Sequence, residues 1–297
     1  MPSPRSIQVF LPEGEPRGIR IASIENRGTK AVAFPRSKSA HAFQRDELGW
    51  VGVYFLFGTK VGADRMSVYI GEAECCSDGL STHNGDQAKD FWQTGVVVVS
   101  GLQSFTKAHV KMLEWASIRK AKDAGRYVVE NSNAGQQPHL PEATAAVVSE
   151  ILEGLEVLLG CLGFPIFDAI ASSADGSADQ TEGTHLFWIK RKGYAARAVY
   201  NEDGLVVLKD SEARPDVVQS SRDLEPDRER LVKQGVLEKR ADKYVFLRDH
   251  VFSAPSSAAE MICGGAINGW DAWVDDQGRT LSEIYRPLKV NGAAASA

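Results

Sequence analysis

Three apolar runs rich in Val, Phe and Tyr lie close together in the first half of the chain, and they require a fold that contains a buried sheet. They are VGVYFLF at residues 51–57, MSVYIG at residues 66–71 and VVVV at residues 96–99. β-Branched and aromatic residues favour strands, and GTKVGADR between the first two runs supplies turn residues. The runs therefore predict an antiparallel hairpin accompanied by a third strand.

Helices are expected to flank this sheet. Ser77 or Asp78 can cap a helix that runs to His83, because both residue types accept hydrogen bonds from the first backbone N–H groups of a helix. Thr106 can cap a second helix over Lys107–Lys122 in the same way. Shorter strands are expected in residues 6–35, where apolar and turn residues alternate. These elements together predict an α+β fold, with a small antiparallel sheet flanked by helices.

The second half of the chain is expected to form a second small α+β domain. ARAVYNEDGLVVLKD and VLEKRADKYVFLRD look like hairpins, and PSSAAEMICGG looks like a helix that begins at capping serines. Asn268–Trp270 is predicted to be a turn that enters a strand. Trp270 and Trp273 are expected to pack in the core, with stacking on nucleic-acid bases as the alternative.

Composition shifts along the chain suggest the domain boundaries. The stretch ASSADGSADQTEG consists of small, polar and acidic residues, as linkers do. Pro141 opens a long amphipathic helix that precedes this stretch. The apolar stripe of that helix comprises Val147, Val148, Ile151, Leu152, Leu155, Leu158 and Leu159. The predicted order is a strand-rich leader packed on the first domain (1–48), the first domain (49–135), a connecting amphipathic helix (136–170), a linker (171–184), a C-terminal accessory domain (185–288) and a disordered tail (289–297).

Charge and cysteine content exclude several classes of protein. The net charge of −5 is wrong for a protein that coats nucleic acid indiscriminately. Residues 186–248 have 14 Lys and Arg against 11 Asp and Glu, a net of +3 that a mixed solvated surface explains equally well. The four cysteines form no C-x-x-C pair, so a structural zinc site is not expected. The absence of a signal peptide and of a long apolar run predicts a cytoplasmic protein that does not bind membranes.

The order of polar residues around the apolar runs resembles that of the GIY-YIG nuclease family. Gly52-Val53-Tyr54 is followed by Tyr69-Ile70-Gly71, a helix that ends near His83, a helix that carries Glu114, and Asn131. Asn133 is the alternative for the last position. The resemblance covers about residues 50–133, and YIGEAE and TKAHVKMLE are similar to the subgroup that carries an additional C-terminal domain.

The resemblance implies metal-assisted hydrolysis of a phosphodiester bond. Glu114 would be the ligand of a divalent ion, Mg²⁺ or Mn²⁺, which would stabilise charge on the phosphate and on the leaving oxygen. Tyr54, Tyr69 and His83 would position or deprotonate the attacking water. Asn131 would be the last of the site residues that the resemblance implies. Taken singly, each tyrosine in an apolar strand also suits a core residue.

Gly79 departs from the family pattern, in which an arginine stands one helical turn before the histidine. Lys107 is the candidate substitute, two turns before Glu114 on the same helix, although a surface lysine at a helix start is an equally good interpretation. An arginine at position 79 is expected to raise cleavage and to favour the helix. The departure also keeps open an alternative in which a catalytically weakened nuclease fold binds DNA or a protein partner without cutting.

The C-terminal part, about residues 185–286, resembles a domain of unknown function found behind GIY-YIG domains and in restriction-modification proteins. FSAPSSAAEMICGGAINGWDAWVDDQGRTLSEIYR and GYAARAVYNEDGLVVLKDS carry this resemblance. It implies that DNA is a partner and that the chain has a role in DNA defence or restriction-modification. A partner protein is a further candidate ligand of this domain. The sequence leaves oligomeric state, substrate sequence and pathway open.

Overall fold

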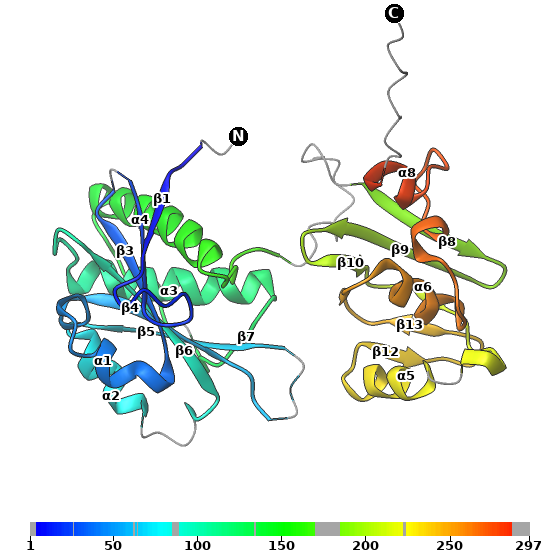
Figure 1. The fold of residues 1–297 in the computed structure, drawn as a ribbon, viewed down its shortest axis with the longest axis horizontal. Helices are drawn as coiled ribbons and strands as arrows, with labels where there is room; N and C mark the ends of the chain where they lie inside the picture. Colours follow the sequence, from blue (N-terminus) through cyan, green and yellow to red (C-terminus); the bar gives the residue numbers. More distant parts are fainter. Residues whose placement is uncertain are drawn as a thin grey trace, which may run out of the picture. The chain divides into compact units, whose positions relative to one another are not determined.

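The computed structural model describes residues 4–25, 27–61, 63, 65–84, 89–133, 135–169, 185–221 and 224–286. The chain divides into two compact units, Met1–Ala169 and Ile170–Ala297 (Figure 1). Both units combine helices with largely antiparallel sheets, so the expected α+β class is confirmed. The predicted linker (171–184) and tail (289–297) lie outside the described residues.

A seven-stranded sheet, counted over the described residues, forms the centre of the first unit, in the order β1–β2–β3–β6–β4–β5–β7. Its neighbours are antiparallel except for β5 and β7, which run parallel. The predicted hairpin is the β4–β5 pair, and VVVV lies in β6 beside β4. The strands are β1 (Ile7–Phe10), β2 (Arg20–Ile24), β3 (Thr29–Pro35), β4 (Gly52–Gly58), β5 (Ser67–Ala73), β6 (Trp92–Ser100) and β7 (Val128–Val129).

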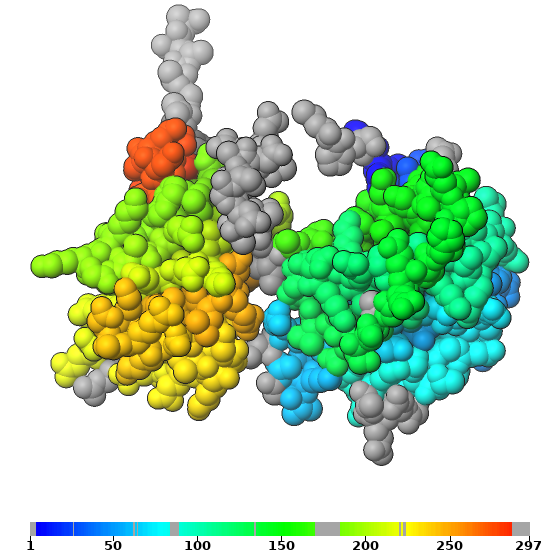
Figure 2. All heavy atoms as spheres, turned by 180° about the vertical axis from the view of Figure 1, so that it is seen from behind, coloured from blue at the N-terminus to red at the C-terminus, as the bar shows by residue number. Residues whose placement is uncertain are grey.

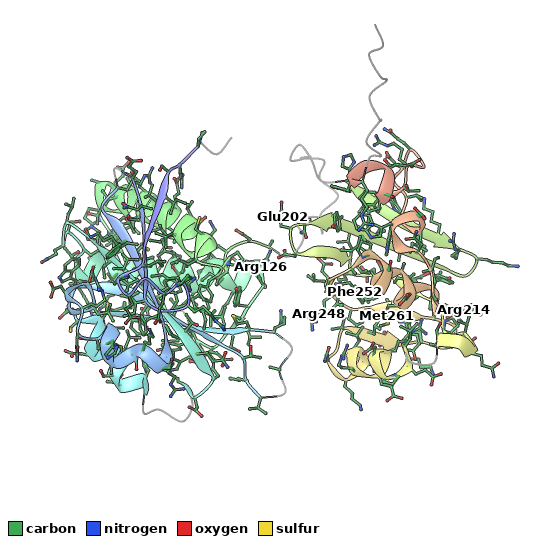
Figure 3. All side chains as sticks on the ribbon, in the orientation of Figure 1. Arg126, Glu202, Arg214, Arg248, Phe252 and Met261 are labelled. Carbon is green, nitrogen blue, oxygen red and sulfur yellow. The ribbon has the colours of Figure 1, made fainter. Side chains whose placement is uncertain are left out.

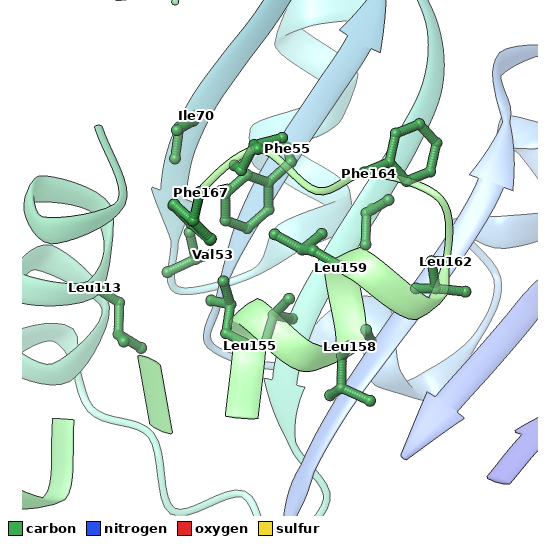
Figure 4. Packing of buried hydrophobic residues seen from close by; sticks show 14 of the residues in the cluster. Val53, Phe55, Ile70, Leu113, Leu155, Leu158, Leu159, Leu162, Phe164 and Phe167 are labelled. Atoms are coloured by element: carbon green, nitrogen blue, oxygen red, sulfur yellow. The ribbon is translucent and has the colours of Figure 1, made fainter. Parts of the chain in front are cut away.

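Helices α3 (Lys107–Ala124) and α4 (Glu142–Cys161) pack on one face of this sheet. Because side chains alternate along a strand, Val53 and Phe55 of β4 point to this face, where they meet the apolar side of α4 (Figure 4). Thr106 accepts a hydrogen bond from the backbone of α3, as predicted. Of the predicted stripe on α4, Val148, Leu155, Leu158 and Leu159 are buried, whereas Val147 is exposed.

The other face of the sheet packs against α1 (Ser39–Ala42), α2 (Cys76–Asn84) and the short 3₁₀ turns Arg36–Lys38 and Asp46–Gly49. Tyr54 and Leu56 of β4 point to this side, next to Cys76 and Leu80 of α2. The predicted cap at Ser77 or Asp78 is wrong, because α2 already begins at Cys76.

The second unit has two sheets in its described residues, in the orders β14–β10–β9–β8 and β11–β13–β12. Both predicted hairpins are present as antiparallel pairs, β9–β10 and β12–β13. The strands are β8 (Leu186–Arg191), β9 (Tyr194–Asn201), β10 (Gly204–Val207), β11 (Glu212–Ala213), β12 (Leu237–Lys239), β13 (Tyr244–Phe246) and β14 (His250–Phe252). The helical elements are a 3₁₀ turn at Gln219–Ser221, α5 (Leu224–Lys233), α6 (Pro255–Cys263), α7 (Gly269–Ala272) and α8 (Leu281–Tyr285).

Two local predictions for this unit are wrong. Asn268 does not lead into a strand; its side chain accepts a hydrogen bond from the backbone of Trp270 and caps α7. The serines after Pro255 do not cap α6, because Pro255 is its first residue and Ala254 holds the cap position. Trp273 is fully buried, as expected of a core residue. No helix in the described ranges has the length and apolar character to cross a bilayer.

Candidate active site

The ring of Tyr54 lies in a slot lined by two glycines. Tyr54 pairs with Gly71 across the β4–β5 ladder and is 4% exposed. A Cβ atom on Gly71 would lie 2.4 Å from both Cζ and Oη of Tyr54, so the ring or the strand would have to move. A Cβ atom on Gly79 of α2 would lie 3.4 Å from Cε1 of the same ring and 3.0 Å from Cβ of Ala73. The ring therefore occupies the space that a side chain at position 71 would need, whereas at position 79 the close contact is with Ala73.

Tyr54, Tyr69 and His83 form one contiguous group. The Oη atom of Tyr54 lies 2.8 Å from Nε2 of His83, which is hydrogen-bond distance. The ring of Tyr69 lies edge-on to His83, with centroids 5.1 Å apart, and 6.4 Å from the ring of Tyr54. Strands β4 and β5 and helix α2 thus bring three of the predicted residues together.

Lys89 joins this group, and sequence reasoning missed it. Its Nζ atom lies 2.7 Å from Nδ1 of His83 and 3.7 Å from the centroid of the Tyr69 ring. The same Nζ atom lies 3.4 Å from Nε2 of His83, so the ammonium group lies against both ring nitrogens, and either tautomer of the imidazole is compatible with the contact to Tyr54. Lys89 follows the end of α2, so no helical spacing could have indicated it.

Glu114 lies on α3, and its charge acts on the hydroxyl of Tyr54. Partial burial, reinforced by the nearby charge of Glu72, raises the pKa of Glu114 to about 7, against the opposing effect of Lys107. Burial also raises the pKa of Tyr54 well above its usual value, with Tyr69 and Glu114 adding to the effect. The tyrosine hydroxyl therefore stays protonated at neutral pH, and the charge of Glu114 acts on it.

Lys107, the predicted substitute for the missing arginine, is engaged elsewhere. Its Nζ atom forms an ion pair with Glu72 at 2.8 Å, and a carboxylate oxygen of Glu74 lies 4.0 Å away. This pairing raises the pKa of Lys107. Lys107 thus neutralises the carboxylate beside Glu114, while Lys89 is the cation in contact with the tyrosine and histidine rings.

The donor set suits a hard divalent ion that keeps most of its water. Among the described residues, no group of three or more His, Cys, Asp or Glu side chains gathers as a closed metal cage. Mg²⁺ commonly binds through only one or two carboxylates together with water and substrate phosphates. Burial is the main cause of the raised pKa of Glu114, and the charge of Glu72 adds to it; a cation bound beside the two carboxylates would relieve their repulsion. Glu114 and Glu72 therefore fit this kind of ion.

Asn131 contacts the backbone rather than the other predicted residues. Its Oδ1 atom accepts a hydrogen bond from N of Ile70 at 3.0 Å, and its Nδ2 atom donates to O of Ile70 at 2.8 Å. These bonds fix the edge of β5 between Tyr69 and Gly71. The contacts assign Asn131 a positioning role, and a direct chemical role for it stays a prediction.

Comparison with known proteins identifies one part of the chain. The comparisons with curated proteins and with solved structures returned no match. Residues 187–285, which lie entirely within the second unit, match the family model described as a domain of unknown function (DUF4357), in agreement with the resemblance seen in the C-terminal sequence.

Proposed function

We propose that this chain is a GIY-YIG-type nuclease that hydrolyses phosphodiester bonds of DNA with a divalent metal ion, Mg²⁺ or Mn²⁺. The observation that carries the proposal is the 2.8 Å contact between Oη of Tyr54 and Nε2 of His83, with Lys89 and Tyr69 packed against the same imidazole. A hydroxyl held in this way, close enough to Glu114 to be affected by its charge, suits chemistry on a phosphate. DNA defence or restriction-modification is the setting that the C-terminal resemblance suggests.

Glu114 and Glu72 would hold the ion, which would stabilise negative charge on the phosphate and on the leaving oxygen. Tyr54 keeps its proton at neutral pH, as tyrosines ordinarily do, and burial raises its pKa further. Its hydroxyl also shares a hydrogen bond with Nε2 of His83. Tyr54 therefore acts as a donor that orients the attacking water or a phosphate oxygen, and it does not remove a proton from water.

Lys89 takes the part that the resemblance gives to an arginine at position 79. Its ammonium group lies against the imidazole of His83 and the face of Tyr69. A cation in this place attracts a phosphate oxygen and stabilises the charge that develops during cleavage. The absence of a cation at Gly79 is thus compatible with activity.

Nicking of supercoiled plasmid DNA tests the proposal. We expect the purified chain to cut in Mg²⁺, to stop when EDTA is added, and to lose cutting in Glu114→Gln. Glu74→Gln is the matched control, because Glu74 is an exposed carboxylate near the site, with a side chain 70% accessible. Equal nicking by the wild type and Glu114→Gln would assign the activity to a contaminant and overturn the proposal.

A second candidate is a weakened nuclease fold that binds DNA or a partner protein without cutting. The close approach of Gly79 to Ala73 favours it, because a Cβ atom at position 79 would lie 3.0 Å from that of Ala73 and would require one of the two to shift. Tight DNA binding without metal-dependent nicking, in a protein that still binds Mn²⁺ through Glu114, would make this the better description.

A further inference from the structure

The hairpin of β8 and β9 carries an unbalanced positive charge. Its residues 186–201 include Lys190, Arg191, Lys192 and Arg197 and no Asp or Glu, in a chain whose net charge is −5. All four side chains are exposed. Within the part of the second unit that the structure describes, ion pairs involve Arg230, Arg240, Lys243 and Arg279, and none involves a cation of this hairpin.

The acidic residues that follow the hairpin lie at the end of β9 opposite to the β8–β9 turn. Glu202 and Asp203 form the β9–β10 turn, whereas Lys192 is in the β8–β9 turn, and β9 spans the eight residues between them. Eight residues of extended strand cover about 26 Å, which exceeds the distance over which surface charges interact strongly in physiological salt. Figure 3 shows Glu202 at the end of the sheet opposite to the β8–β9 turn, and Figure 2 shows the hairpin standing out from the body of this unit.

Trp188 adds an aromatic surface beside these cations. Phe187 and Ile189 point into the core of the unit, so Trp188, between them, points to the opposite face and is only half-buried. Arg197 is its direct partner across the ladder, and Nζ of Lys190 lies 5.5 Å from its ring centroid. Two backbone hydrogen bonds with Val274, of 2.7 and 3.1 Å, hold Trp188 in place.

Cations beside one indole face favour single-stranded nucleic acid over other anionic ligands such as a lipid surface. Exposed cations attract phosphates without regard to sequence, and an aromatic ring beside them can stack on a base whose face is not already covered by a neighbouring base pair. A lipid surface would require exposed apolar side chains at the tip. The large apolar side chains exposed in the described part of this unit are Val232, Leu247 and Tyr285, and none belongs to the hairpin.

We propose that the β8–β9 hairpin binds single-stranded nucleic acid, with its exposed cations on the phosphates and Trp188 stacked on an unpaired base. The surface belongs to the second unit, and its ligand contacts do not depend on cleavage chemistry in the first. It provides a place where the chain holds a strand independently of any metal ion.

The experiment measures the affinity of the 297-residue chain for a fluorescent oligonucleotide over a range of salt concentrations, with EDTA present so that no cleavage occurs. We expect Lys190→Gln/Lys192→Gln to weaken binding and to reduce the slope of log affinity against log salt by about 1.4, since each lost phosphate contact with a single strand contributes about 0.7. Trp188→Leu should weaken binding about 5- to 150-fold, the range for one stacked base, with little change in slope.

Matched controls separate this surface from general electrostatics. Lys233→Gln/Lys239→Gln removes the same charge from exposed positions elsewhere in the unit and should leave affinity and slope nearly unchanged. Trp188→Phe keeps an aromatic face and should bind more tightly than Trp188→Leu, while thermal unfolding confirms that each variant is folded. DNA and RNA oligonucleotides of one sequence identify the preferred strand.

Several outcomes would overturn the proposal. One is an equal loss of affinity in the two lysine double variants, which would indicate attraction to overall charge. Another is unchanged binding in folded Trp188→Leu. A third is binding to anionic lipid vesicles without binding to either oligonucleotide. Because no step requires Glu114 or metal, a failure of the nuclease proposal leaves the expected results of this experiment unchanged.

Discussion

The aromatic ring of Tyr54 lies directly over Gly71, the residue that pairs with it across the β4–β5 ladder. The first motif, GVY, therefore contributes a ring, and the second, YIG, contributes the space that the ring occupies. The hydroxyl group of this ring reaches His83 only because no side chain intervenes at position 71.

Gly71→Ala should therefore displace Tyr54 and break its hydrogen bond to His83. The added methyl group would lie 2.4 Å from Oη, so the ring or the strand must move. Overpacking of this kind costs about 1–3 kcal/mol of unfolding free energy, which chemical denaturation measures. Cleavage should fall as well. Gly49→Ala, at an exposed glycine with open space and no positive φ, provides the comparison for a general effect of losing a glycine.

Gly79→Arg should lower cleavage, in contrast to the gain that the sequence alone suggests. The new Cβ atom would lie 3.0 Å from Cβ of Ala73, so α2 must shift slightly relative to β5, and His83 of α2 would move relative to Tyr54. In Gly79→Ala, alanine stabilises the helix by about 1 kcal/mol relative to glycine, which offsets the close contact of the new methyl group with Ala73. The unfolding free energy of this variant should therefore stay near that of the wild type. Faster nicking by Gly79→Arg, with unchanged stability, would contradict this account.

Glu114 should make the protein less stable as pH rises. Its folded pKa of about 7 exceeds the value of 4.5 expected in the unfolded chain. Between these values the folded state retains a proton that the unfolded state has lost, so stability is highest below pH 4.5 and falls up to about pH 7. Because solvent screens this partly exposed carboxyl, we expect a change of only about 1 kcal/mol.

Chemical denaturation of the wild type and of Glu114→Gln across this pH range isolates the contribution of the Glu114 carboxyl to the pH dependence of stability, because glutamine does not titrate. The difference in unfolding free energy between the two proteins should shrink when Mg²⁺ is absent and the pH is low. Mg²⁺ should raise the unfolding free energy of the wild type more above pH 7 than below it. A wild-type profile parallel to that of Glu114→Gln would show that Glu114 has an ordinary pKa.

Lys89→Gln should reduce cleavage by about 10²–10³, the usual effect of removing one charge-stabilising donor. Lys107→Gln should have a smaller effect on cleavage, because Lys107 pairs with Glu72 and does not contact the tyrosine group. Nitrogen NMR of the His83 ring provides a readout that folding alone would not change: the tautomer balance of the imidazole should shift in Lys89→Gln, because the ammonium group lies against both ring nitrogens in the wild type. Equal rates for Lys89→Gln and the wild type would remove Lys89 from the mechanism.

Asn131→Ala should destabilise the edge of β5. The substitution leaves N and O of Ile70 without the partners they have in the native protein, at a cost of about 1–3 kcal/mol. Faster hydrogen exchange at the Ile70 amide would locate the effect. Asn133→Ala is the matched control, since Asn133 is exposed and its side chain accepts only from N of Gly135 among the bonds described.

Local sequence signals predicted much of the scaffold. The β4–β5 hairpin and the Thr106 cap of α3 depend on residues adjacent in sequence, so pattern and capping chemistry were sufficient. The position of Lys89 beside His83 depends on the path of the chain after α2, which no periodic pattern encodes. The assignment of Asn268 failed for another reason: an Asn-Gly pair suits both a hairpin turn and a helix cap, and tertiary packing decided between them.

The carboxamide of Asn131 imitates a peptide group. It offers Ile70 one acceptor and one donor, as the backbone of an adjoining strand would, and so continues the two-residue strand β7 with a side chain. Exposed strand edges are templates on which other chains can pair and aggregate. At Ile70 that template is already occupied, so the stretch of β5 that carries Tyr69 and Gly71 is protected from pairing with a foreign strand.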